Sequence, residues 1–295
     1  MKRKRTKHLF SRVKWPWPNR KYKDTVFRLL FNSDKRALLE LYNALNNSNY
    51  DNPDDLIINT LDNAIFMGMH NDLSFIIDTH LNIYEHQSTD CPNIPLRCLF
   101  YVGKLYSQLI DDNKIYGSSM LGIPEPHFVV FYNGIDPLPE KMTYKLSDMY
   151  EDCSAEPALE LAVTVLNINQ GMNNSLMHGC KKLYEYSEYV AVVRQYAEKM
   201  PLNKAIANAI DYCIEHDILK DFLLKERKAV SMYSLYEYNQ AGHMKVVRDE
   251  GVQQGIAMGE SKERTRVIKS MLLKGKSPED VAELCDCLLE EVIAV

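Results

Sequence analysis

Hydrophobic residues recur at three- and four-residue spacing over residues 24–46, a pattern that predicts an amphipathic helix. Asp24 stands where the N-cap of that helix is expected, and the asparagine-rich run 46–49 ends it. The same spacing returns over residues 95–110 and predicts a second helix.

Shorter apolar runs lie between and after these two stretches. Residues 56–67 carry a strand-like mixture, and the runs 73–77 and 81–84 flank a short polar loop, which predicts a β-hairpin. Compact runs at 128–132 and 159–168 predict two further strands. This order of elements predicts an α/β fold, a mixed sheet flanked by helices. The helical pattern that follows predicts an extension packed on the sheet.

The C-terminal part of the chain has a different pattern, with Gly251, Gly255 and Gly259 at four-residue intervals. Such a stripe permits either close helix packing or a flexible joint. Each glycine costs a helix about 1 kcal/mol relative to alanine, so a joint is favoured. We expect four parts: a basic arm over 1–23, a core with its helical extension over 24–240, a glycine joint over 241–262 and a small helical tail over 263–295.

The tail pattern predicts one short helix over 267–273 and another that opens with Ser277 as N-cap and Pro278 at its first position. Two short helices joined by a glycine turn resemble a helix-turn-helix. The second helix carries Glu279 and Asp280, which repel phosphate. We therefore expect the tail to contact protein rather than DNA.

Charge is distributed unevenly along the chain, whose net charge is −5. Residues 1–23 hold ten Lys or Arg side chains, beginning with Lys2, Arg3, Lys4 and Arg5, and no acid. The other 272 residues hold 25 basic and 40 acidic side chains. A basic arm on an acidic body is either a tail that binds a polyanion such as DNA or a solvated leader. Two tryptophans in the arm favour docking on the body or stacking on bases.

Composition and cysteine usage bear on location. No apolar run is long enough for a membrane span, and the charged N-terminus lacks the apolar stretch of a signal peptide. The seven scattered cysteines are then expected to be reduced thiols in a cytoplasmic protein. The C-x-C pair Cys285 and Cys287 lacks the spacing that zinc prefers.

The hairpin carries the candidate chemistry. If its turn is centred near Thr79, Asp72 lies opposite His86 or Gln87, with Glu85 beside them. Side chains alternate along a strand, so Glu85 and Gln87 point to the same side. Two carboxylates and an amide at one point suit Mg²⁺ or another hard divalent cation. The structural alternative is a turn cap at Asp72 and a solvated strand end.

The chain resembles the Rpn family of recombination-promoting nucleases and transposases, within the PD-(D/E)XK nuclease superfamily. The resemblance covers about residues 20–225. It is carried, in family order, by segments at residues 23–31, 71–75, 85–89, 95–97, 128–134, 146–148 and 167–169. The Glu-His-Gln-Ser run at 85–88, following an Asp at this distance, is the most specific of them.

The resemblance implies a restriction-endonuclease-like αβββαβ core, with Asp72 and Glu85 as metal ligands. Gln87 stands where the wider superfamily has a catalytic lysine, and a neutral amide only donates a hydrogen bond or orients water. Asp24 is similar to an acidic residue that some members present to the site, or it caps the first helix. Arg97 either meets a phosphate or forms a surface salt bridge.

These observations lead to two hypotheses. The first is a Mg²⁺-dependent DNA endonuclease that hydrolyses phosphodiester bonds and is associated with recombination or mobile elements, in the bacterial cytosol that the resemblance implies. The second is a nuclease-derived module with weak or no turnover that binds DNA or protein. The pattern leaves open whether the target is DNA or RNA; a homodimer is a further expectation, since nucleases of this superfamily often cut two strands in pairs.

Overall fold

In the computed structural model, the described residues are 26–60, 71–152, 156–285 and 288–293. The chain divides into two compact units, Met1–Glu237 and Tyr238–Val295. Asp24, the arm that includes Lys2, Arg3, Lys4 and Arg5, and part of the predicted strand region 56–67 lie outside the described residues.

A six-stranded mixed sheet with the strand order β1-β2-β3-β4-β6-β5 forms the centre of the first unit. The strands are β1 (Ile57–Ile58), β2 (Leu73–Ile77), β3 (His80–Gln87), β4 (Glu125–Tyr132), β5 (Lys141–Lys145) and β6 (Ala162–Asn167). β3, β4 and β6 run parallel, while β1, β2 and β5 pair antiparallel with their neighbours. The predicted α/β class is therefore confirmed.

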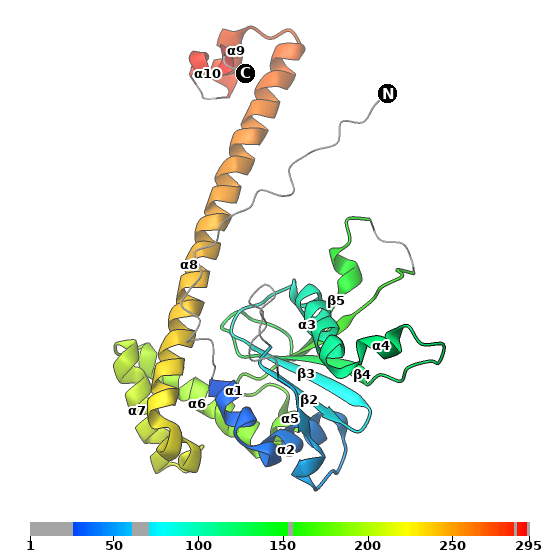
Figure 1. Cartoon of the computed structure of the whole chain (residues 1–295). Coiled ribbons are helices and arrows are strands. Elements are labelled where there is room, and N and C mark those ends of the chain that lie inside the picture. Colours follow the sequence, from blue (N-terminus) through cyan, green and yellow to red (C-terminus); the bar gives the residue numbers. More distant parts are fainter. Residues whose placement is uncertain (1–25, 61–70, 153–155, 286–287, 294–295) are drawn as a thin grey trace. The chain divides into compact units, whose positions relative to one another are not determined.

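Helices cover both faces of this sheet. The helices of the first unit before α8 are α1 (Val26–Asn32), α2 (Lys35–Asn46), α3 (Ile94–Leu109), α4 (Asp112–Ile115), α5 (Asn174–Gly179), α6 (Lys181–Ala197) and α7 (Leu202–Glu215), with the 3₁₀ turns η1 (Pro53–Asp55) and η2 (Leu146–Met149). Figure 1 shows α3 on one side of the sheet and α1, α2 and α5 on the other. The central strand β3 is buried along almost its whole length, because both of its faces are covered.

The two faces have different cores. On one face, apolar residues of β3, β4 and β6, such as Ile83 and Val130, pack with Cys98 and Leu105 of α3. On the other face, aromatic rings dominate: Phe27 of α1 lies 5.1 Å from the ring of Phe131 on β4, and further rings surround this pair. Successive side chains of β3 therefore point in turn into the aliphatic core on one face of the sheet and into the aromatic core on the other.

The helix predicted over 24–46 is instead two helices, α1 and α2. Asp34 separates them, since its carboxylate accepts hydrogen bonds from the N–H groups of Arg36 and Ala37 and caps α2. Apolar periodicity continues through the break, so the periodicity alone did not reveal it.

The second unit begins within α8 (Lys220–Leu273), which continues through the three glycines. The sequence favoured a joint at these glycines, whereas the structure has continuous helix there, because isolated glycines weaken a helix without ending it. Gly275, with φ +82°, follows α8, and the Ser277 side chain caps α9 (Pro278–Leu284) as predicted. Helix α10 (Leu289–Ile293) forms a small hydrophobic core together with α8 and α9.

Candidate active site

The β2–β3 hairpin brings Asp72 and Glu85 to the same point. Leu73 pairs with Tyr84, so the next position of the register sets Asp72 against Glu85. The expected register, with Asp72 opposite His86 or Gln87, was wrong. The turn contains two residues rather than three, Asp78 has the left-handed φ of +50° that a tight hairpin needs, and His80 already belongs to β3.

Backbone N–H groups donate hydrogen bonds to the carboxylates of both acidic residues. The N–H of Asp72 donates to Glu85 Oε1 at 3.0 Å, and the N–H of His86 donates to Asp72 Oδ2 at 2.8 Å. Asp72 is half-buried, and only 3% of the Glu85 side chain is exposed. The hydrogen bonds therefore bring Asp72 and the Glu85 carboxylate to the same end of the hairpin, as the sequence predicted.

Arg97 of α3 is the third member of this arrangement. Its Nη2 donates to Glu85 Oε2 at 2.8 Å and to the hydroxyl of Tyr101 at 2.9 Å. The predicted alternatives for Arg97 were a phosphate contact and a surface salt bridge. The structure shows an ion pair with a buried carboxylate, which a charge-assisted hydrogen bond strengthens.

The electrostatics of the pair favour a cation. Burial, and next the charge of Asp72, raise the pKa of Glu85, while Arg97 opposes them. The two carboxylates repel each other when both are ionised. A divalent cation between them removes that repulsion, which is why such pairs exchange protons for metal ions.

Gln87 ends β3 on the same side of the strand as Glu85. Its Nε2 is buried, and within the described part of the chain no group accepts a hydrogen bond from it. Buried amides are normally satisfied, so an unpaired one two residues along the strand from Glu85 marks a place for a polar ligand. The structure thus sets the predicted Gln87 at the candidate site.

A third carboxylate, Glu237 of α8, was missed at the sequence level. Its Oε1 accepts a hydrogen bond from the N–H of Val26 at 2.9 Å, at the start of α1. Burial, and then the charge of Asp72, raise its pKa. Glu237 stands between two tyrosines in a run without any motif, so no local signal could have found it.

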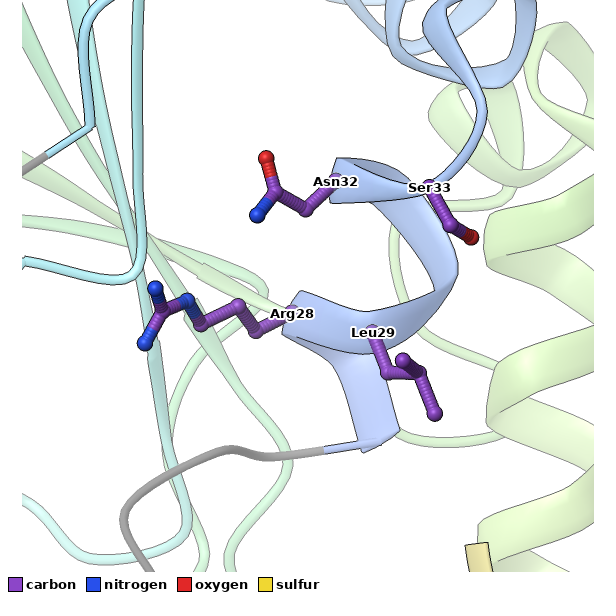
Figure 2. A pocket seen from close by; sticks show the side chains of 4 residues that line it. All are labelled: Arg28, Leu29, Asn32 and Ser33. Carbon is purple, nitrogen blue, oxygen red and sulfur yellow. The ribbon is translucent and has the colours of Figure 1, made fainter. Parts of the chain in front are cut away.

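Arg28 of α1 supplies a second positive charge, which acts to lower the pKa of Glu85. It lines a hollow of about 200 Å³ together with Leu29, Asn32 and Ser33. Arg28 and Asn32 extend from one side of α1, whereas Leu29 and Ser33 lie on its other side (Figure 2). A phosphate near the carboxylate pair would therefore find a guanidinium close to it.

His86, between the two site residues, serves the fold. It faces the aromatic layer, where its ring stacks on Phe27 at 5.1 Å and its Nε2 lies 2.9 Å from the hydroxyl of Tyr186. Burial, with the charge of Arg194, lowers the pKa of His86 to about 3. The ring is thus neutral, and the contribution of His86 to the site is its backbone N–H.

Comparison of the chain with family models, with curated proteins and with solved structures finds no match. Within the described residues, no helix combines the length and the apolar character needed to cross a membrane.

Proposed function

We propose that the chain is a Mg²⁺-dependent endonuclease of the PD-(D/E)XK type that cuts DNA, and a member of the Rpn family. The order of elements supports this: α1 and α2 precede β1, β2 and β3, and α3 and β4 follow. With α2, η1 and α4 as additions, this order resembles the αβββαβ order of a restriction-endonuclease-like core.

The main observation behind the proposal is the pair of Asp72 and Glu85, joined by hydrogen bonds near the C-terminal end of β3. Carboxylate oxygens are the ligands that Mg²⁺ prefers, and one or two of them with several waters complete its shell. The unpaired amide of Gln87 beside them fits a water or a phosphate oxygen. The residues present therefore suit the group that the proposal requires.

When bound, Mg²⁺ supplies a water of lowered pKa and neutralises charge on the phosphoryl group. Asp72 and Glu85 would hold the cation, which would require Glu85 to share its Oε2 with Arg97 or to give up that ion pair. Hydrolysis would join a water oxygen to phosphorus and release the sugar oxygen, with solvent taking the proton of the water and supplying one to the leaving oxygen.

Gln87 donates a hydrogen bond to the attacking water or to a non-bridging phosphate oxygen. A neutral amide gives less stabilisation to developing negative charge than a lysine does. We therefore expect slow turnover. The arm that includes Lys2, Arg3, Lys4 and Arg5 brings the DNA to a body whose net charge would repel it. Pairing of two chains to cut both strands, and a protein partner for the tail, belong to the same proposal.

Nicking of supercoiled plasmid DNA tests the proposal. The wild-type chain should nick with Mg²⁺ and not with EDTA, and Asp72→Asn should abolish nicking because a neutral amide binds the cation poorly. Asp54→Asn, a change at an exposed carboxylate of η1, is the matched control and should nick normally. Undiminished nicking by a clean preparation of Asp72→Asn would refute the site.

One observation favours a second candidate, a nuclease-derived module that binds DNA without cutting it. Arg97 occupies Glu85 and neutralises a carboxylate that a metal ion needs. The same experiment separates the two functions. Salt-sensitive DNA binding without nicking, in Mg²⁺ and in Mn²⁺, would indicate the module.

A further inference from the structure

A second group of metal-ligating side chains lies at the opposite end of β3 from Glu85. The ligand atoms of His80, Glu125 and His127 all lie within 4.8 Å of one another. From His80 to Glu85 the strand advances roughly 16 Å, and the two side chains point to opposite faces. The group is therefore separate from the candidate active site.

The sheet itself brings the three residues together. β3 and β4 are parallel neighbours, and His80 pairs directly with Glu125 at the first position of each strand. His127 lies two residues further along β4, on the same face as Glu125. The N–H of Glu125 donates to the carbonyl of Thr79 at 2.8 Å, which fixes the hairpin turn against the start of β4.

The two imidazoles are close but do not satisfy each other. Their ring centroids lie 4.9 Å apart at an interplanar angle of 34°, and His127 Nε2 is 3.9 Å from Glu125 Oε2. The Nδ1 atom of His80 is buried, and none of the described residues forms a hydrogen bond with it. A buried ring nitrogen without a partner is a position that an ion or a water normally fills.

We propose that His80, Glu125 and His127 bind a zinc-class divalent cation. Two imidazoles and one carboxylate are a ligand set that zinc uses with water in the fourth position. Hard cations such as Mg²⁺ prefer oxygen ligands. The ligands at this end of β3 therefore favour a different cation from the carboxylates at the other end.

The geometry requires only a small adjustment. Bonds of about 2.0–2.1 Å in a tetrahedron place ligand atoms roughly 3.3 Å apart, somewhat closer than in the structure. The Glu125 side chain is 72% exposed and free to rotate toward the two rings. Burial, with the neighbouring His80, lowers the pKa of His127, so its ring is available as a neutral ligand at pH 7.

The cation would join the β2–β3 hairpin to β4 and leave its open position toward solvent. His127 also lines a hollow of about 480 Å³ between the C-terminal end of α2 and the sheet, together with Asn82, Lys141 and Thr164. A cation at this point can therefore exchange its water with solutes.

Zinc binding by the full-length, reduced, metal-free chain tests the proposal, measured by titration calorimetry and by the metal content after dialysis. One Zn²⁺ should bind per chain, and His80→Ala, His127→Ala and the double variant should each weaken that binding at least tenfold. His178→Ala changes an exposed histidine on α5 and should bind as the wild type does. Asp72→Asn should also bind normally, which separates this site from the candidate active site.

Two further measurements separate loss of a ligand from loss of folding and identify the ligand type. His80→Asn and Glu125→Gln retain polar side chains of similar size. Circular dichroism should show that both variants fold, and calorimetry should show weaker zinc binding. Cobalt in place of zinc should give ligand-field bands without the sulfur-to-metal charge-transfer absorption of bound cysteine. Zinc binding that survives in the double variant, a cysteine signature in the cobalt spectrum, or no binding at all would overturn the proposal.

Discussion

Arg97 affects both the stability of the fold and the charge of the candidate site, because it pairs with the buried carboxylate of Glu85. Its guanidinium is the one cation that the described residues place in hydrogen-bond contact with Glu85, and it is 39% exposed while Glu85 is buried. A carboxylate left alone in that position must either remain charged without compensation or take a proton. If Mg²⁺ binds as proposed, it competes with Arg97 for Glu85 Oε2.

Arg97→Met keeps most of the aliphatic stem and removes the charge. In the absence of divalent ions we expect the free energy of unfolding to fall by about 1–3 kcal/mol, because a buried acceptor loses its partner. Mg²⁺ should stabilise this variant more than it stabilises the wild type, since the cation then has Glu85 to itself. Urea unfolding with and without Mg²⁺ measures both effects, with Arg97→Lys as the control that retains charge.

Equal stability of Arg97→Met and the wild type in EDTA would contradict the ion pair. An equal response of both proteins to Mg²⁺ would contradict the competition.

At the scale of elements, Asp34 decides where α1 ends and α2 begins. It caps α2, and its carboxylate also meets the ammonium of Lys182 on α6. Burial acts to raise the pKa of Asp34, but the hydrogen bonds to Lys182 and to the helix N–H groups outweigh burial and lower it. The charged form is thus the one that stabilises the fold.

Asp34→Ala should cost about 1 kcal/mol of stability at pH 7, a typical value for a lost N-cap. A carboxylate whose folded pKa lies below its ordinary value of about 4 stabilises the protein above that value, and the contribution disappears as the pH falls through the folded pKa. The difference between the wild type and Asp34→Ala should therefore be largest near neutral pH and shrink toward pH 3.

Urea unfolding at pH 7 and pH 3 checks this. Asp34→Asn retains a capping oxygen but not the charge, so it should lose less stability than Asp34→Ala at pH 7. A difference that stays constant with pH would contradict the role of the charged carboxylate.

The elements with strong periodicity were predictable from sequence, and the others show why periodicity has limits. α3, β4 and β6 have apolar runs dense enough to be found, whereas β5 is an edge strand whose exposed residues alternate with partly buried ones and leave little apolar signal. The hairpin was found but its register was not, because a one-residue difference in turn length changes every pair.

The candidate site divides in the same way. Asp72, Glu85 and Gln87 lie on one hairpin, so sequence proximity already brings them together. Glu237 depends on α8 reaching the start of α1, and the ion pair of Arg97 depends on α3 reaching the hairpin. Tertiary contacts of that kind leave no local pattern. The group of His80, Glu125 and His127 depends on the parallel pairing of β3 with β4, which the local sequence pattern of the hairpin does not specify.

At the scale of the whole molecule, the two ends of β3 offer different sets of metal-ligating side chains. Oxygen ligands at the C-terminal end suit a hard cation, and the mixed imidazole and carboxylate group at the N-terminal end suits zinc. Under the proposed function, some of the carboxylates of the acidic body bind metal ions. The basic arm, outside the described residues, remains the predicted means of bringing a polyanion to it.

The most direct measurement is the position of Mn²⁺, a visible substitute for Mg²⁺, in crystals of the full chain soaked with that ion. We expect an anomalous peak between a carboxylate oxygen of Asp72 and one of Glu85, with Arg97 shifted away from Glu85 or sharing its carboxylate with the ion. Peaks only at other positions, with Arg97 still bound to Glu85 at 2.8 Å, would contradict this expectation.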